Sequence, residues 1–306
     1  MMENKKGLLL VFFTAVVSGF SIFINSFGVK GFDSSVFTFS KNVVVALFLF
    51  SIIIFLNQFN ELKKLDRRHW LQLAGIGLIG GSIPFLLFFK GLQMATGTAA
   101  GFIHKTMFVY AAVFALLFLK EKLTKGLFFG ALLLLAGNYF MIRPDFNLSL
   151  GIVFIFIATV LWAAENILAK YVLKELSGTV VAFGRMFFGS LFILVFLLAT
   201  GKAALVFSMS YNQYLWIALT SIFLLLYVFT YYNGLKAVKV TTASCILALG
   251  APITTLLSFV FNGTAISLYE GLGMLLIVLG VISVIWLLQI VSFATNIFTI
   301  RQDERN

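Results

Sequence analysis

The chain has 306 residues, of which 61% are hydrophobic and 11% charged, and its mean hydropathy is +1.06. A water-soluble fold could not bury that much apolar surface, and an intrinsically disordered chain would lack it. The net charge is +11, but the basic residues are spread over many short connections and form no single stripe, so no nucleic-acid partner is expected. The composition predicts a protein whose solvent is the lipid bilayer.

Ten apolar runs are long enough to cross a bilayer, which takes about 20 residues of helix. In chain order they are expected near residues 7–29, 34–57, 70–93, 97–119, 125–142, 149–173, 179–200, 212–235, 240–262 and 267–290. The first run is too long for a signal peptide and no small-residue cleavage site follows it, so it is read as a retained helix. The runs are too continuously apolar for outer-membrane strands, which alternate. The sequence therefore predicts an all-α integral membrane protein.

The distribution of lysine and arginine predicts the orientation of these spans. With the amino terminus inside, most basic residues, among them Arg67 and Arg68, fall in cytoplasmic connections. Only Lys30, Arg143 and Lys202 fall outside. Because inner loops carry an excess of Lys and Arg, both termini are expected in the cytoplasm of a multi-pass plasma-membrane protein.

The sequence repeats itself at a distance of 143 residues. This shift aligns Phe88, Lys90, Gly91 and Leu92 with Tyr231, Asn233, Gly234 and Leu235, and Gly130 and Gly137 with Gly273 and Gly280. We expect a five-helix repeat over residues 1–147, a second over 148–290, and a cytoplasmic C-terminal tail over 291–306. Because five is odd, the second repeat is inverted, which provides the two interchangeable states that alternating access requires.

Four runs carry a resemblance to a known family: FFKGLQMATGTAAGFI, FLKEKLTKGLFFGALLLLAGNYFMI, YYNGLKAVKVTTASCILALGAPITTLL and LYEGLGMLLIVLGVISVI. Over nearly its whole length the chain resembles the drug/metabolite transporter superfamily, most closely its bacterial EamA-type members. Glu121 matches the glutamate that members commonly show after the fourth span, and Thr264 stands at the corresponding place in the second half. Lys41 and Arg185 match a basic residue early in the second span of each half. The resemblance implies movement of metabolites, often export of amino acids or related compounds, through a central cavity.

Other motifs give no support for an enzyme or for a bound cofactor. Gly75, Gly77 and Gly80 have the spacing of a dinucleotide-binding loop, but they lie inside an apolar run without a preceding strand, so helix packing is expected. The two histidines, His69 and His104, lie far apart in the sequence, so no metal site is expected. A membrane-embedded enzyme is the alternative from a different class. It would need a nucleophile with a base, and every aspartate lies in a loop or tail.

Four ionisable residues fall at membrane depth, where a charge costs at least about 2.5 to 3.5 kcal/mol. Lys41 is long enough to reach the outer headgroups, so a purely structural placement stays open beside substrate contact. Lys105, next to His104, is deeper, and we expect it to help recognise an anionic group. Glu165 is the one acid well inside the core and is expected to be a proton or cation site. Arg185 lies at its level and would hold either Glu165 or backbone carbonyls.

Polar residues three or four apart share a helix face and indicate which faces line a cavity. The expected lining residues are Ser18, Ser21 and Asn25 on the first span, Trp162, Glu165 and Asn166 on the sixth, Tyr227 and Tyr231 on the eighth, and Thr241, Thr242 and Ser244 on the ninth. The alternative is that the hydroxyls bond to their own helix and the tyrosines form an interfacial belt.

These residues indicate a secondary transporter, expected to be an exporter, of a small polar metabolite such as an amino acid or related carboxylate. Three basic groups against one acid favour a ligand with a carboxylate or phosphate. An exporter of cationic or lipophilic drug-like compounds, which would use Glu165 and the aromatic residues, is the alternative. The expected partners are the substrate, protons and the lipid bilayer, with the chain as a monomer or homodimer.

Overall fold

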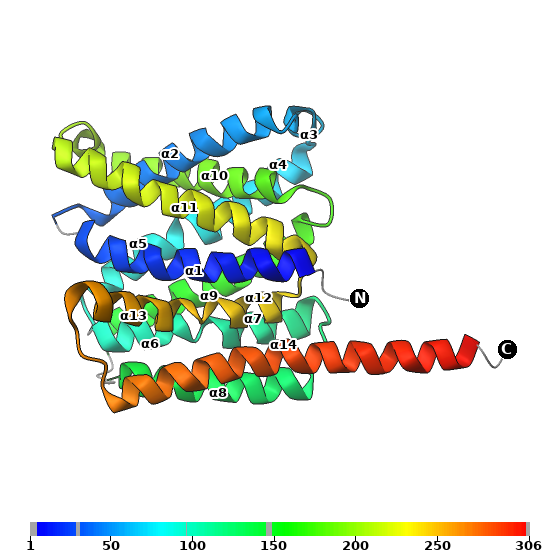
Figure 1. The fold of residues 1–306 in the computed structure, drawn as a ribbon. Helices are drawn as coiled ribbons and strands as arrows, with labels where there is room; N and C mark the ends of the chain where they lie inside the picture. Colours follow the sequence, from blue (N-terminus) through cyan, green and yellow to red (C-terminus); the bar gives the residue numbers. More distant parts are fainter. Residues whose placement is uncertain (1–4, 29–30, 96, 145–148, 304–306) are drawn as a thin grey trace.

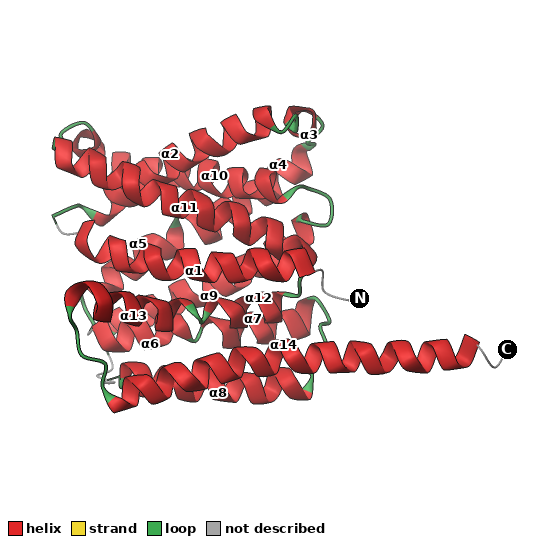
Figure 2. Ribbon diagram, viewed as in Figure 1, coloured by secondary structure: helices red, strands yellow, loops and turns green. Residues whose placement is uncertain are grey.

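The computed structural model describes residues 5–28, 31–95, 97–144 and 149–303, which Figure 1 shows as a ribbon. Over these residues the chain forms fourteen α-helices and one 3-10 helix, and no strand (Figure 2). Ten helices or helix pairs among them are long and apolar enough to cross a membrane. The prediction of an all-α, multi-pass membrane protein is confirmed.

The ten spans are distributed five to each half of the chain. The first half contains α1 (Lys5–Gly28), α2 (Ser34–Phe55), α4 with α5 (Arg67–Gly81, Ile83–Leu92), α6 with α7 (Gly97–Lys105, Met107–Phe118) and α8 (Lys125–Ile142). The second half contains α9 (Leu150–Val172), α10 (Gly178–Ala199), α11 (Tyr211–Ala237), α12 with α13 (Val240–Leu247, Gly250–Asn262) and α14 (Leu268–Asp303). The connections include α3 (Phe59–Lys63) and the 3-10 helix η1 (Ala203–Val206).

Short polar residues fix where several spans begin. The side chains that accept a hydrogen bond from the first turn of their helix are Asp33 for α2, Thr124 for α8, Ser149 for α9, Ser177 for α10 and Ser210 for α11. Such caps satisfy backbone N–H groups that have no partner inside the helix. A helix start is therefore anchored at the membrane edge by the residue just before the apolar run.

Asp33 also joins the two halves, because its carboxylate accepts a hydrogen bond from Lys202 Nζ at 2.6 Å. The pKa of Asp33 lies below its ordinary value. Partial burial raises it, but the hydrogen bond from Lys202 and those from the backbone N–H groups of Val36 and Ser35 outweigh burial. This ion pair lies at the face of the bundle opposite the two termini, which Figure 1 places on one side.

The last span of each half packs against its counterpart, with α8 and α14 antiparallel and side by side (Figure 1). The two helices approach closely at Gly137 and Gly273. A Cβ on Gly137 would lie 2.7 Å from the Gly273 carbonyl oxygen, and a Cβ on Gly273 would lie 2.6 Å from that of Gly137. Only glycine allows two backbones this close in lipid. Figure 1 also shows α14 continuing beyond the bundle, over residues expected to form the tail.

Three spans are interrupted inside the bundle. The third span breaks at Ser82, just before Pro84, and the ninth breaks between α12 and α13, just before Pro252, because proline has no N–H to continue the helix. The fourth span breaks at Thr106 without a proline. Adding 143 to 106 gives 249, so the breaks in the fourth and ninth spans occupy equivalent places in the repeat.

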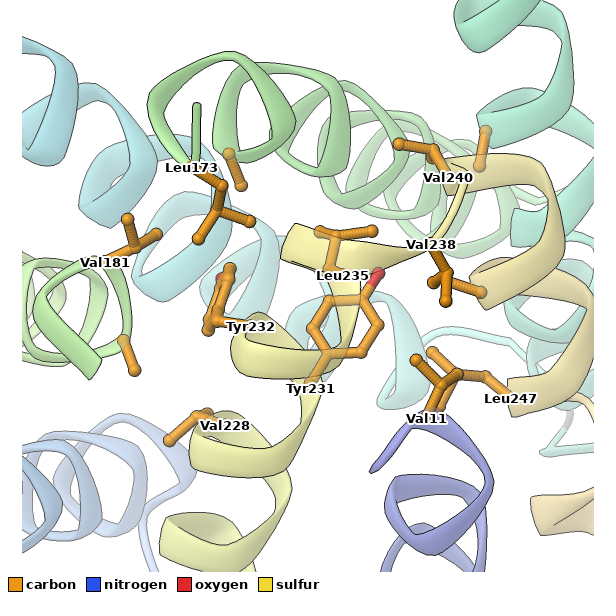
Figure 3. Packing of buried hydrophobic residues seen from close by; sticks show 14 of the residues in the cluster. Val11, Leu173, Val181, Val228, Tyr231, Tyr232, Leu235, Val238, Val240 and Leu247 are labelled. Carbon is orange, nitrogen blue, oxygen red and sulfur yellow. The ribbon is translucent and has the colours of Figure 1, made fainter. Parts of the chain in front are cut away.

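The face that carries the termini is closed by apolar packing and by side chains that bond to the α11–α12 connection. Figure 3 shows part of the apolar cluster, in which the labelled residues are Val11, Leu173, Val181, Val228, Tyr231, Tyr232, Leu235, Val238, Val240 and Leu247. Glu121 accepts hydrogen bonds from the backbone N–H of Val240 at 2.9 Å and from the Thr241 hydroxyl at 2.7 Å. Lys170 Nζ donates to the carbonyls of Leu235 and Val238, each at 2.6 Å.

Candidate functional site

A cavity of about 510 Å³ lies between the two halves. Its wall is formed by α1, α2, α5, α7, α9, α10 and α11, together with His104 at the end of α6. At one end it reaches Tyr231 and Tyr232, which belong to the cluster that closes the face with the termini. From there it extends along the far ends of α1 and α5, at Asn25 and Leu92. The cavity therefore runs from the closed face toward the opposite face.

Most residues that the sequence singles out lie on this wall. They are Ser18, Ser21, Asn25, Lys41, His104, Trp162, Glu165, Asn166, Arg185, Tyr227 and Tyr231. Lys105 instead lines a second chamber of about 70 Å³ beside the cavity, as does Ser244. Thr241 and Thr242 line neither space, because Thr241 bonds to Glu121 and Thr242 is buried in packing. That the wall residues bind a substrate stays a prediction.

Lys41 provides a cation on the wall from the amino-terminal half of α2. It is 9% exposed, and its Nζ donates to the side-chain carbonyl of Asn25 at 3.3 Å and lies 4.8 Å from the ring centroid of Phe37. The Asn25 amide in turn donates to the backbone carbonyl of Ser21 at 2.7 Å. Lys41 therefore turns into the cavity and does not reach for the headgroups.

The backbone carbonyl of Gly80 holds two side chains of another part of the wall. In a continuous helix the carbonyl of Gly80 would accept the N–H of residue 84, but Pro84 has none. Two side chains take its place: Arg185 Nη2 donates to Gly80 O at 2.9 Å, and Trp162 Nε1 donates to the same oxygen at 3.0 Å. The proline thus creates an acceptor inside the bundle, and α9 and α10 are held to it.

Glu165 lies beside this carbonyl and shares its neighbourhood with Arg185. Tyr232 donates its hydroxyl to Glu165 Oε1 at 2.6 Å. Within the described part of the chain the two charged groups form no direct ion pair, so of the two partners expected for Arg185 the structure shows the backbone carbonyl. An ideal Cβ on Gly80 would lie 2.4 Å from Glu165 Cγ and 3.1 Å from Arg185 Nε, so both side chains pack directly on this glycine.

Aromatic rings cover much of the remaining wall. The ring of Trp162 has its centroid 5.2 Å from that of Phe85, 5.5 Å from that of Phe88 and 5.0 Å from that of His104. Tyr227 stacks on Tyr231 at 5.7 Å on the other side. Edge-on and stacked rings at these distances form an apolar surface with weakly negative faces.

Sequence reasoning missed several wall residues. Phe85, Phe88 and Phe89 recur at spacings of three and four, which predicts one helix face but does not distinguish a cavity from lipid. Tyr232 was missed although it holds Glu165. Asn42, whose amide donates to the Gly81 carbonyl at 3.0 Å, follows the recognised Lys41 directly. Among the described residues no group of three or more His, Cys, Asp or Glu side chains could hold a metal ion.

Comparison with known proteins identifies the family. The EamA-like transporter family matches residues 5–143 and again residues 149–286, once in each half. The chain belongs to this family. It is 24% identical over 292 residues to the uncharacterized transporter YyaM of Bacillus subtilis (strain 168), covering 91% of this chain and 95% of that one. The membership makes this chain a membrane transporter.

Two further likenesses concern a second relative and the fold. Protein LicB of Haemophilus influenzae is 27% identical over 221 residues, which is 65% of this chain and 75% of that protein. A solved crystal structure, described only as that of a protein, superimposes with a TM-score of 0.77 at 17% identity and covers 94% of this chain and 99% of its own. At that identity the superposition shows the fold alone.

The packing on Gly80 leads to a testable prediction. Gly80→Ala places a methyl group against Glu165 and Arg185, and overpacking of this kind destabilises by about 1–3 kcal/mol. Gly75→Ala, on the same helix, meets only the flexible end of Leu168 at 3.3 Å and is expected to change stability by less. The measurement is unfolding of both purified variants in mixed detergent micelles with increasing dodecyl sulfate. Equal stability of the two variants would contradict the described packing.

Proposed function

We propose that this membrane transporter is a secondary transporter that moves a small polar metabolite by alternating access through the central cavity. The observation that supports it most directly is a cavity between two inverted halves that is closed at one face and extends toward the other. Inverted repeats exchange such states by rocking one half against the other around a site near the membrane midplane. The interrupted third, fourth and ninth spans are typical of such sites.

The charges of the wall support an amino acid or a related carboxylate as the substrate. Lys41 and Arg185 line the cavity and Lys105 lines the adjoining chamber, against Glu165 as the one acid of these walls. The positive surplus favours an anionic group on the ligand. The aromatic surface around Trp162 favours the drug-like alternative, because a cation or an apolar group could also pack against these rings.

We further propose net export across the plasma membrane, with both termini in the cytoplasm. Lysine and arginine gather in the connections at the face with the termini, as the positive-inside rule requires of a cytoplasmic face. On this orientation the described state is closed to the cytoplasm and its cavity extends toward the outside. Protons are the proposed coupling ion, and the chain acts as a monomer or homodimer.

Flux in proteoliposomes tests the transport function. Vesicles containing the purified chain and loaded with a panel of amino acids, monocarboxylates and organic cations are assayed by counterflow of the labelled compound, with and without a proton gradient. We expect saturable exchange of at least one compound that carries a carboxylate. Exchange no faster than in protein-free vesicles for the whole panel would reject the function, and exchange of organic cations alone would select the drug-like alternative.

Glu165 is the proposed coupling residue. Burial in a low dielectric favours the protonated acid, whereas a nearby guanidinium favours the carboxylate, so the balance changes with access of water. The charged and titratable groups around it are Arg185 on α10 and Tyr227, Tyr231 and Tyr232 on α11. Of these, Tyr232 bonds directly to the carboxylate. A proton taken up in one state and released in the other would link protonation to access.

Replacing Glu165 with Gln separates coupling from structure. We expect Glu165→Gln to retain substrate exchange but to lose the pH dependence of net transport, because glutamine keeps the hydrogen bond from Tyr232 but cannot titrate. The measurement is net flux against counterflow at several pH values in the same vesicles. A loss of binding would indicate direct contact with a cationic group of the substrate. Normal binding, rate and pH dependence would leave Glu165 with a structural role only.

The orientation is tested by cysteine labelling, for which the chain is suited because its single cysteine, Cys245, is fully buried. Ser208→Cys adds an exposed thiol at the face opposite the termini, and Lys122→Cys adds one at the face that carries them. In intact cells an impermeant maleimide should label Ser208→Cys and not Lys122→Cys. The reverse pattern would place the termini outside.

A further inference from the structure

The second chamber lies where the interrupted fourth and ninth spans meet. His104 and Lys105 precede the break at Thr106, and Leu247 and Ala248 lie at the equivalent break of the other half. α1 and α11 complete the wall with Ser18 and Tyr227 among others. Helix breaks at corresponding places of an inverted repeat are where transporters build substrate and ion sites. The position of the chamber therefore points to a ligand.

The wall of the chamber provides hydrogen-bond donors and a cation. It contains the ammonium of Lys105 and the hydroxyls of Ser18, Tyr227 and Ser244, but no aspartate or glutamate. In the described part of the chain Lys105 forms no hydrogen bond or ion pair. An ammonium inside the membrane without a partner is costly, so an anion that enters is stabilised. The Ser244 hydroxyl already donates to the Val240 carbonyl, which leaves Ser18 and Tyr227 as hydroxyl donors.

The size of the chamber limits what can enter. Its volume is about 70 Å³, against about 510 Å³ for the main cavity. The smaller space suits a single small group such as a carboxylate, and the larger cavity suits the rest of a metabolite. Ser18, Ile22, His104, Met107 and Tyr227 line both the chamber and the main cavity, so the two spaces share a boundary. A carboxylate in the chamber can remain joined to a body in the cavity.

We propose that this chamber binds the carboxylate of a monocarboxylate substrate, with Lys105 as the cation and Ser18 and Tyr227 as hydroxyl donors. The body of the molecule lies in the cavity against the rings of Phe88 and Trp162. This inference rests on the proposed transport function and names its substrate class. It separates carboxylates from their carboxamides, in which the corresponding group has nearly the same shape but no charge.

The test uses the purified full chain and pairs of ligands that differ only in the anionic group: L-leucine with L-leucinamide, and 3-phenylpropionate with 3-phenylpropanamide. Apparent affinities come from thermal-shift titrations. We expect the wild type to prefer each carboxylate, and Lys105→Met to weaken carboxylate binding about tenfold or more, the loss typical of a charged hydrogen bond. Carboxamide binding should not change, and Lys105→Arg should retain the preference.

Matched variants keep the test decisive. Lys90→Met removes an exposed lysine of α5 that lines neither space, and it should leave every affinity unchanged. If Lys105→Met does not fold, Ala248→Leu tests the chamber from the opposite wall, because it fills the space while Lys105 stays in place. Carboxylate affinity should fall in this variant too. Unchanged selectivity in Lys105→Met or in Ala248→Leu would overturn the inference.

Two further outcomes separate this inference from the proposed function. If sodium chloride alone stabilises the wild type but not Lys105→Met, and carboxylates do not compete with it, the chamber is an inorganic-anion site and the inference is wrong. If proteoliposomes exchange a compound while Lys105→Met keeps its carboxylate preference, transport stands and the inference alone fails. If the wild type neither binds nor exchanges any compound of the panel, the proposed function fails, and the substrate class proposed from it fails with it.

Discussion

A carbonyl that loses its N–H partner inside a lipid bilayer must be satisfied by another part of the protein, because no water is present to do so. Pro84 creates this situation at Gly80. Arg185 and Trp162, on two different helices of the other half, donate hydrogen bonds to this carbonyl. The positions of Arg185 and Trp162 beside Glu165 are thus set by the need to satisfy the Gly80 carbonyl.

The same requirement explains how one face of the bundle is closed. Between α11 and α12 the chain turns, and its free backbone groups are taken by Glu121 from the first half and by Lys170 from the second. Opening this face means releasing charged hydrogen bonds, each worth about 1.5–3 kcal/mol. At the opposite face Asp33 and Lys202 join the halves. Because both side chains are partly exposed, this ion pair stabilises less. In the proposed alternating-access cycle, a transition between states would exchange one set of contacts for the other.

The sequence predicted the spans and the repeat well, because apolar length and a fixed shift are properties that lipid imposes on every helix. It also singled out the buried charges, since Lys41, Glu165 and Arg185 are conspicuous in apolar runs. The hydrogen-bond partners of these charged residues were harder to predict from the sequence. The acceptor for Arg185 is a backbone atom freed by a proline 101 residues earlier in the chain, as 185 less 84 shows. The phenylalanines of the wall have the same spacing as phenylalanines that face lipid, so only the packing of other helices distinguishes them.

The two halves share the same arrangement of helices but differ in the side chains at equivalent positions. The position equivalent to Glu121, at 121 plus 143, is Thr264, which is neutral and shorter. Lys41 and Arg185 occupy matching places in their spans, yet one bonds to an amide and the other to a freed carbonyl. An inverted repeat therefore makes two states geometrically possible, but it does not make them equal in energy. A ligand shifts such a balance only through its different affinity for the two states, and in the proposed cycle that difference would arise at the unequal walls of this cavity.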